Sequence, residues 1–287
     1  MKRTYVLFLP LLLLLLLGFG LVAYPLVSSY YTERHQSEVH TAYQAVLEQA
    51  GNEEIEAARA AADDYNRLLA SGTTAAELET MDYDSLLNLA GNGIMGYIEI
   101  PAIDVLLPIY HGVGEDSLER GAGHLPDTSL PIGGKGTHAV ISAHTGMATS
   151  RMFTDLEQLE VGDLFYLHVL DETLAYEVDQ ILVVKPYQID ALGIDVTEDY
   201  VTLVTCTPYG VNSHRLLVRG RRVETASNSF PNTSDVTAVE DAPRQSTWMV
   251  KYWAGILQGL AMGLAVALTL CLWRFARKHR KRGRYEA

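Results

Sequence analysis

Residues Thr202 to Gly220 read TLVTCTPYGVNSHRLLVRG, in which two apolar runs flank a loop rich in turn-forming residues. The first run is typical of a β-strand and ends at Cys206, and Pro208 and Gly210 favour a turn directly after it. The chain then returns in a second apolar run that includes Arg215. The stretch therefore predicts two neighbouring strands with Cys206 and Arg215 at adjacent ends.

Short apolar runs of the same kind occupy the chain between Gly93 and Val223. They are separated by Gly, Pro and Asp, and about seven or eight strands fit into this range. The runs are GYIEI, VLLPIYHG, HAVISAH, LFYLHVL, LAYEVDQILVV, YVTLVTC and HRLLVRGRRV. Because they are rich in Val, Ile, Leu and Tyr, a mainly β domain is predicted over residues 93–223.

Helical patterns precede the β domain within residues 28–92. Residues 28–70 are rich in Glu, Ala, Gln and Arg, and Gly51-Asn52 divides them into two predicted helices, the second from Glu53 to Leu69. A weaker helical pattern runs from Leu78 to Leu89. After the β domain, residues 224–247 lack apolar periodicity, so a flexible stalk is predicted there.

Two long apolar segments lie near the ends of the chain. Residues 5–27 contain no charge, and at about 1.5 Å per residue they span a hydrocarbon core of about 30 Å. Residues 248–273 form a second predicted span, with Trp and Tyr where interfacial aromatic residues lie. A cleaved signal peptide is the alternative for the first segment. Its apolar run exceeds the usual length of about 7–15 residues and no small-x-small cleavage site follows, which favours an uncleaved anchor.

The distribution of charge predicts the topology. Residues 1–4 and the tail over 274–287 are basic, so the positive-inside rule places both termini in the cytoplasm and residues 28 to about 249 outside. Between Thr4 and Val250 there are 34 acidic and 12 basic residues, a net charge of −22. Such an acidic exterior argues against nucleic acid as a partner.

The chain has two cysteines, and Cys271 lies in the second predicted span. Cys206 therefore has no disulfide partner in the outer region. No CxxC, HExxH or carboxylate cluster with metal spacing occurs, so no metal site is predicted. A thiol becomes a nucleophile beside a base or cation, and a guanidinium can bind an oxyanion. Cys206 and Arg215 thus suit acyl transfer through a thioester, provided that a histidine moves protons.

This reasoning excludes only some of the nine histidines as the residue that moves protons. Three of the nine lie in the helical prelude or the basic tail. His144 ends the run AVISAH before Thr145-Gly146, so its ring can project from a strand end. His214 is the rival closest to the thiol in sequence, but neighbouring strand residues face opposite sides, so His214 and Arg215 cannot both face the thiol. The remaining candidates are His111, His124, His138 and His168.

These motifs resemble the sortase family. TLVTC with an arginine nine positions after the cysteine looks like the family's TLxTC signature, and His144 matches its strand-end histidine. The passages GIMGYIEIPAIDVLLPIYHG, GAGHLPDTSLPIGGKGTHAVISAHTG and TLVTCTPYGVNSHRLLVRG resemble the pilin-polymerising class C branch. Two flanking membrane spans and a basic tail are also similar to that branch.

The resemblance implies a fold, a reaction and roles for three residues. The fold is an eight-stranded β-barrel, here with an N-terminal helical segment and two flanking transmembrane helices. Cys206 is the implied nucleophile, His144 the general acid and base, and Arg215 the group that binds the substrate carbonyl and its oxyanion. The implied substrates are pilin or surface proteins with an LPxTG-like tail and a pilin lysine that accepts the acyl group. No cofactor is implied.

One part of the sequence departs from the class C pattern. That branch often carries a lid with an Asp-Pro-aromatic motif over the cysteine, and residues 66–88 contain no proline. Asp82 and Tyr83 are the nearest equivalent. They stand either in a working lid or in a plain helix that leads into the first strand.

Three other functions remain open on the sequence. A sortase that attaches surface proteins to a cell-wall peptide amine differs only in its acceptor. A cysteine hydrolase would use water at the same thioester. A membrane-bound scaffold would bind protein tails without catalysis, although the set of Cys206, His144 and Arg215 argues against it.

Overall fold

The computed structural model describes residues 18, 20, 24, 27, 39–73, 78, 80–147, 150–224 and 255–259. The chain divides into two compact units, Met1–Arg244 and Gln245–Ala287, and the first contains the β domain. No helix within the described residues is long and apolar enough to cross a bilayer. The predicted spans over 5–27 and 248–273 lie almost entirely outside them, as do residues 1–4, the tail over 274–287 and nearly all of the predicted stalk.

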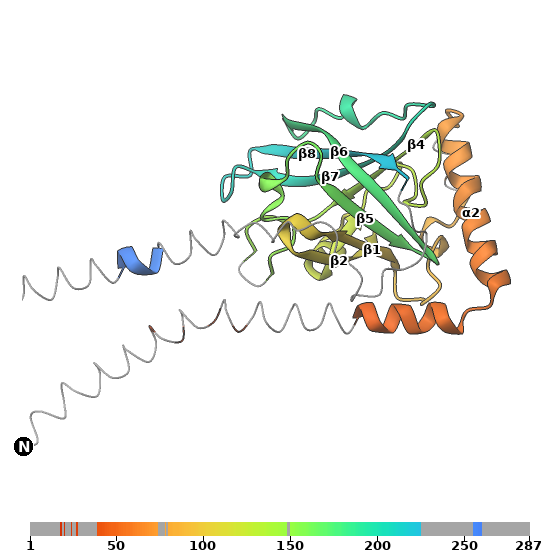
Figure 1. Cartoon of the computed structure of the whole chain (residues 1–287), viewed down its shortest axis with the longest axis horizontal. Helices are drawn as coiled ribbons and strands as arrows, with labels where there is room; N and C mark the ends of the chain where they lie inside the picture. Colours follow the sequence, from red (N-terminus) through yellow and green to blue (C-terminus); the bar gives the residue numbers. More distant parts are fainter. Residues whose placement is uncertain are drawn as a thin grey trace, which may run out of the picture. The chain divides into compact units, whose positions relative to one another are not determined.

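In the described residues, eight strands close into a barrel in the order β1-β2-β3-β4-β7-β8-β6-β5, which confirms the predicted mainly β fold (Figure 1). The pairs β2–β3 and β4–β7 are parallel, and the other pairs are antiparallel. Each apolar run singled out in the sequence forms a strand. β3, with three residues, is too short to show a periodic pattern. The strands are β1 Ile94–Ile100, β2 Val105–His111, β3 Ala122–His124, β4 Thr137–Ser142, β5 Leu164–Val169, β6 Glu172–Val184, β7 Asp199–Thr207 and β8 His214–Val223.

The helices before the barrel confirm the predicted break. One helix covers residues 39–49, and α2 runs from Asn52 to Ala70, with Gly51 extended between them. α4 (Glu115–Arg120) connects β2 to β3. Short 3-10 turns are η1 Tyr83–Ser85, η2 Pro101–Ile103, η3 Leu156–Gln158 and η4 Asp190–Leu192.

The helix predicted over Leu78 to Leu89 is wrong from Thr80 onward, whereas Leu78 itself is helical. After η1 the chain turns, because Leu87 has a positive φ of 60° and the Asn88 side chain binds backbone groups on both sides. Its Nδ2 donates to Asp84 O at 2.9 Å and its Oδ1 accepts from Gly93 N–H at 2.9 Å. Leu86 and Leu87 are buried in the main core. The apolar spacing therefore reflects a turn packed on the barrel.

The core fills the barrel and extends beneath α2. Phe165 and Tyr176 stack inside it with ring centroids 5.6 Å apart. Gly220 lies against them, and a Cβ at this position would come within 2.4 Å of the Phe165 ring, so only glycine fits. Ile55 and Tyr65 of α2 belong to the same cluster, which places this helix against the barrel (Figure 1).

Asn66 fastens α2 to the segment after β3. Its Nδ2 donates to Leu130 O at 3.1 Å, and its Oδ1 accepts from Leu130 N–H at 2.6 Å. Both residues are buried, with Asn66 only 3% exposed. One side chain therefore satisfies two backbone groups that no water reaches.

We expect Asn66→Ala to lower the free energy of unfolding by about 2 kcal/mol, because it leaves the buried Leu130 N–H unpaired, whereas Leu130 O still accepts from Ile132 N–H at 2.8 Å. Urea unfolding followed by circular dichroism measures the change. Arg67→Ala is the matched control: Arg67 pairs with Asp64 at the exposed surface, and its loss should change stability by less than about 0.5 kcal/mol. Equal effects of the two substitutions would contradict the anchoring role.

Candidate active site

Cys206 and Arg215 lie directly opposite each other on β7 and β8. Opposed residues of an antiparallel pair face the same side, with Cβ atoms about 4.5–5.5 Å apart. The loop over residues 208–213 closes this hairpin. The prediction that the thiol and the guanidinium occupy adjacent strand ends is therefore confirmed.

His144 reaches the same place through the parallel pair of β4 and β7. Ser142 pairs with Val204, so continuing this register by two residues places His144 beside Cys206. Ala143 N–H donates to Val204 O at 3.1 Å, which shows that the pairing continues past the end of β4. The structure thus brings together three residues that are up to 71 positions apart in the chain.

Two further contacts hold the backbone around His144. The Thr205 hydroxyl donates to Ala143 O at 2.8 Å, and Phe153 N–H donates to His144 O at 3.0 Å. Thr205 is only 4% exposed, so its bond is shielded from water. No sequence pattern pointed to Phe153, whereas the Thr205 hydroxyl stands directly before the cysteine in the motif.

The three residues are each partly exposed, as a group that meets a substrate must be. Cys206 is a free thiol. Arg215 Nη1 donates to His214 O at 3.2 Å, and among the described residues Arg215 forms no ion pair with a carboxylate. Its charge therefore remains available for the carbonyl oxygen of a substrate.

The other barrel histidines are engaged elsewhere. His214 pairs with Thr207, one register position from the thiol and on the opposite face from Arg215, and it contacts the Ser213 hydroxyl. The ring of His138 contacts Gly193 O and the Thr202 hydroxyl. The ring of His111 contacts the backbone oxygens of Gly93 and Leu86. The ring of His168 contacts the side chains of Glu99 and Thr173. Their positions leave His144 as the histidine in register with Cys206.

Tyr83, one of the two candidate lid residues, is bound to the β2–β3 side of the barrel. Its hydroxyl donates to His124 Nδ1 at 2.8 Å and accepts from Gly112 N–H at 3.2 Å. The Tyr83 ring also lies edge-on to His111. Asp82 is exposed, and its side chain makes no capping hydrogen bond on η1. Whether this segment works as a lid remains a prediction.

His124, the partner of Tyr83, is fully buried, and its second hydrogen bond determines which ring nitrogen accepts from the tyrosine. Its Nε2–H donates to Ser129 O at 2.8 Å, which leaves Nδ1 as the acceptor for the tyrosine. Burial lowers the pKa of His124 to about 4 and raises the pKa of Tyr83, so both groups are neutral at physiological pH. The contact is therefore a neutral hydrogen bond inside the fold.

No group of three or more His, Cys, Asp or Glu side chains that could hold a metal occurs in the described part of the chain. The site consists of a thiol, an imidazole and a guanidinium at the ends of three adjacent strands. These are the groups needed for cysteine-based acyl transfer.

Comparison with known proteins agrees with this chemistry. The sortase domain family matches residues 98–223. The crystal structure of sortase C1 from Streptococcus agalactiae aligns with a TM-score of 0.63 and 44% identity, covering 66% of this chain and 99% of that one. Sortase C from Clostridium perfringens, solved with the C-terminal cell wall sorting motif, gives a TM-score of 0.59 and 44% identity, covering 66% of this chain and 100% of that one.

Curated relatives include sortases A. That of Bacillus anthracis is 26% identical over 216 residues, which are 75% of this chain and 93% of the relative. That of S. agalactiae is 28% identical over 149 residues, which are 50% of this chain and 59% of the relative. The chain belongs to the sortase family, and its structural neighbours are class C sortases. This membership indicates a cysteine transpeptidase.

We expect iodoacetamide to modify Cys206 with a rate that rises linearly with reagent concentration, since Tyr83 is bound to His124 and Gly112 and the thiol is partly exposed. Mass spectrometry of the Cys271→Ala chain isolates this thiol. Tyr83→Phe should change the rate by less than about twofold. A rate that saturates with reagent, and that Tyr83→Ala accelerates, would instead show that a lid must open.

We expect acidification to destabilise the wild type relative to His124→Gln. The folded pKa of His124 is about 4, below the ordinary value of 6.5, so the unfolded chain binds a proton first as the pH falls. The contribution of His124 to stability is lost between these two values and stays constant below them, a change of about 3 kcal/mol. Urea unfolding at several pH values measures it, and parallel curves for the two chains would contradict it.

Proposed function

We propose that this protein is a membrane-anchored sortase of the class C type that polymerises pilin subunits. The observation that carries the proposal is the alignment of Cys206, Arg215 and His144 at three adjacent strand ends. The likeness to sortases C, at 44% identity over nearly the whole of those chains, supports the choice of branch. A pneumococcal sortase C is described in terms of pilin substrate specificity, and we extend that substrate class to this chain.

The proposed reaction begins with attack of the Cys206 thiolate on the threonine carbonyl of an LPxTG-like signal. Arg215 binds the developing oxyanion, and His144 gives a proton to the glycine amine as the Thr–Gly bond breaks. The threonine acyl group is then a thioester on Cys206. A pilin lysine amine attacks it and loses a proton to His144, and the thiolate leaves. Cys206 forms and releases the acyl bond, and His144 carries the protons. The reaction therefore needs no cofactor.

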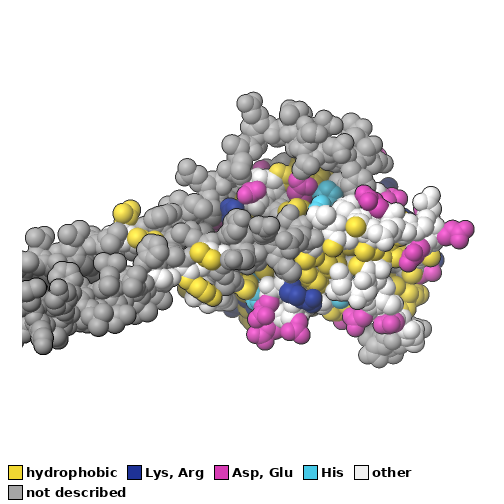
Figure 2. Space-filling view, turned by 90° about the horizontal axis from the view of Figure 1, so that it is seen from below, with side chains coloured by type: hydrophobic (Ala, Val, Ile, Leu, Met, Phe, Trp, Pro, Cys, Tyr) yellow, Lys and Arg dark blue, Asp and Glu magenta, His cyan; other side chains and the backbone are white. Residues whose placement is uncertain are grey.

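The proposed location follows from the two apolar segments. Residues 5–27 and 248–273 anchor the chain, both termini face the cytoplasm, and the barrel lies outside the membrane. This location brings the thiol to the compartment in which pilins emerge. Asp and Glu side chains are scattered over the described surface (Figure 2), in keeping with the acidic composition of this region.

The alternatives differ in what resolves the thioester. Relatives named sortase A keep open the attachment of surface proteins to a cell-wall peptide amine. Water in place of an amine would make the protein a hydrolase. A scaffold would form no thioester at all.

We expect the full-length chain, incubated in detergent with a pilin that bears an LPxTG-like tail, to form a thioester on Cys206 and lysine-linked pilin multimers. Cys206→Ala should abolish both products because it removes the nucleophile. Cys271→Ala is the matched control and should retain both. Mass spectrometry identifies the adduct and the cross-linked lysine.

The outcomes separate the alternatives. A thioester that only cell-wall peptide amines or water resolve would contradict pilin polymerisation and support the corresponding alternative. Binding of the tail without any adduct would support the scaffold. Multimers that persist in Cys206→Ala would overturn the assignment of the nucleophile.

A further inference from the structure

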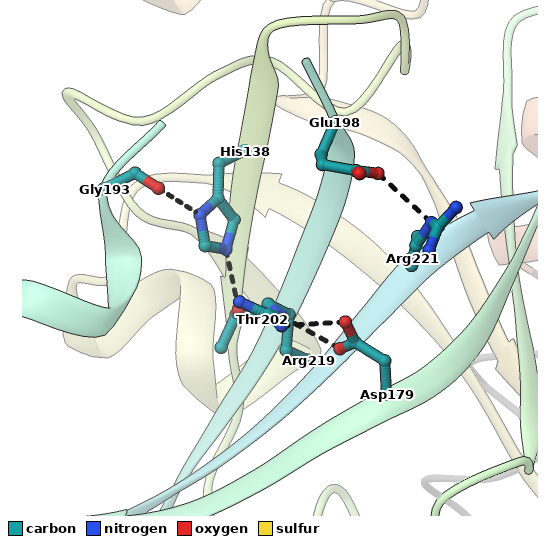
Figure 3. Close-up of polar contacts among 7 residues, drawn as sticks. All are labelled: His138, Asp179, Gly193, Glu198, Thr202, Arg219 and Arg221. Carbon is teal, nitrogen blue, oxygen red and sulfur yellow. Dashed lines mark hydrogen bonds and ion pairs between the residues drawn. The ribbon is translucent and has the colours of Figure 1, made fainter. Parts of the chain in front are cut away.

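The connection between β6 and β7, residues 185–198, contacts the outer face of the barrel at β4. Val201 and Leu203 belong to the barrel core, so the alternating Thr202, Val204 and Cys206 point outward. Thr202 is nevertheless only 1% exposed. The connection reaches this point through Gly193, whose carbonyl faces the outward side chain of His138 on β4 (Figure 3).

His138 joins the connection to the barrel through both ring nitrogens. Its Nδ1–H donates to Gly193 O at 2.9 Å, and its Nε2 accepts from the Thr202 hydroxyl at 2.7 Å (Figure 3). Because a carbonyl can only accept, this tautomer is fixed by the Gly193 contact. Among the described residues, this is the one hydrogen bond that joins residues 186–195 to a barrel strand.

Further polar contacts connect the barrel strands next to the His138–Thr202 hydrogen bond. Thr202 lies opposite Arg219 on β8, and Arg219 donates two hydrogen bonds to Asp179 on β6, at 2.9 and 2.7 Å (Figure 3). The Arg219 guanidinium also covers the Tyr200 ring at 4.1 Å. His138, Thr202, Arg219 and Asp179 thus form a row with one residue on each of β4, β7, β8 and β6.

The distance from this row to the Cys206 thiol follows from the spacing of residues along β7. Thr202 and Cys206 are four residues apart on β7, which is about 13 Å at about 3.3 Å per residue. An extended peptide of about four residues has the same length. Between the two ends, Val204 and Ser142 are partly exposed, and the connection carries three exposed apolar side chains, Tyr187, Ile189 and Val196.

We propose that His138 is a positioning residue that fixes the β6–β7 connection beside the strip leading to Cys206, and that it thereby sets the affinity for the sorting peptide. The inference rests on the proposed function for the identity of the peptide. His138 touches neither the thiol nor the reacting carbonyl. Its loss frees the middle of the connection and weakens peptide binding, while the thiol, imidazole and guanidinium stay in register.

The test uses the full-length chain in detergent and an internally quenched LPxTG peptide as the probe. In His138→Ala, we expect KM to rise about tenfold, as loss of a hydrogen-bonded anchor implies, and kcat to change by less than about twofold. The rate of Cys206 alkylation should stay unchanged. Hydrogen exchange of residues 186–195 should accelerate, whereas exchange in β7 should not.

Matched variants separate positioning from general damage to the fold. Thr202→Val removes the hydroxyl and should shift KM and exchange in the same direction, while Thr202→Ser keeps the hydroxyl and should restore both. Glu198→Gln removes the ion pair with Arg221 at the end of the same connection and should leave KM near the wild-type value (Figure 3). These variants also decide the question if His138→Ala fails to fold.

Two results would overturn the inference. One is an unchanged KM with unchanged exchange in His138→Ala and Thr202→Val. The other is a joint loss of kcat, thiol reactivity and thermal stability, which would show a merely structural role. If the wild-type chain does not cleave the peptide, the proposed function fails instead, and the exchange of residues 186–195 then decides by itself whether His138 fixes the connection.

Discussion

The register between β4 and β7 is the constraint on which the site depends. A parallel pair cannot be closed by a hairpin, so the chain makes a long crossover through β5 and β6 between His144 and Cys206. Side chains alternate along each strand, and a slip of one residue would turn the cysteine toward the core. Ile141, Leu203 and Val218 prevent such a slip because each is fully buried inside the barrel.

The two threonines of TLVTC strengthen this pairing from opposite faces of β7. Thr205 points inward and donates to Ala143 O, next to the histidine of the site. Thr202 points outward and donates to His138 on the same strand, β4. Valine would suit both strand positions equally well by shape, but it lacks the hydroxyl. The motif therefore combines strand-forming side chains with two hydrogen bonds that fasten β7 to its parallel neighbour.

The parts of the site differ in how far the sequence could predict them. Cys206 and Arg215 were placed together by local reasoning, because a short loop joins their strands. His144 was selected by family resemblance, since no local pattern reports which strands pair after a crossover. The helix predicted over Leu78 to Leu89 was wrong beyond Leu78, because apolar spacing cannot distinguish a helix from a turn docked on the core. The β6–β7 connection gave no signal, as its anchor at Gly193 is a backbone carbonyl.

Solvent access separates the histidines that hold the fold together from the one proposed to carry protons. A neutral imidazole has a donor and an acceptor on different sides of its ring, so it can join a loop carbonyl to a hydroxyl. His138 and His124 both do so, and burial lowers the pKa of each, which keeps the ring neutral and the contact intact. His144 is partly exposed, and among the described residues its ring has no hydrogen-bond partner. A buried ring with both nitrogens hydrogen-bonded, such as that of His138, could not exchange protons with a substrate. Histidine can serve both the structural role and the proton-carrying role only because the barrel buries some histidines and leaves His144 in reach of water.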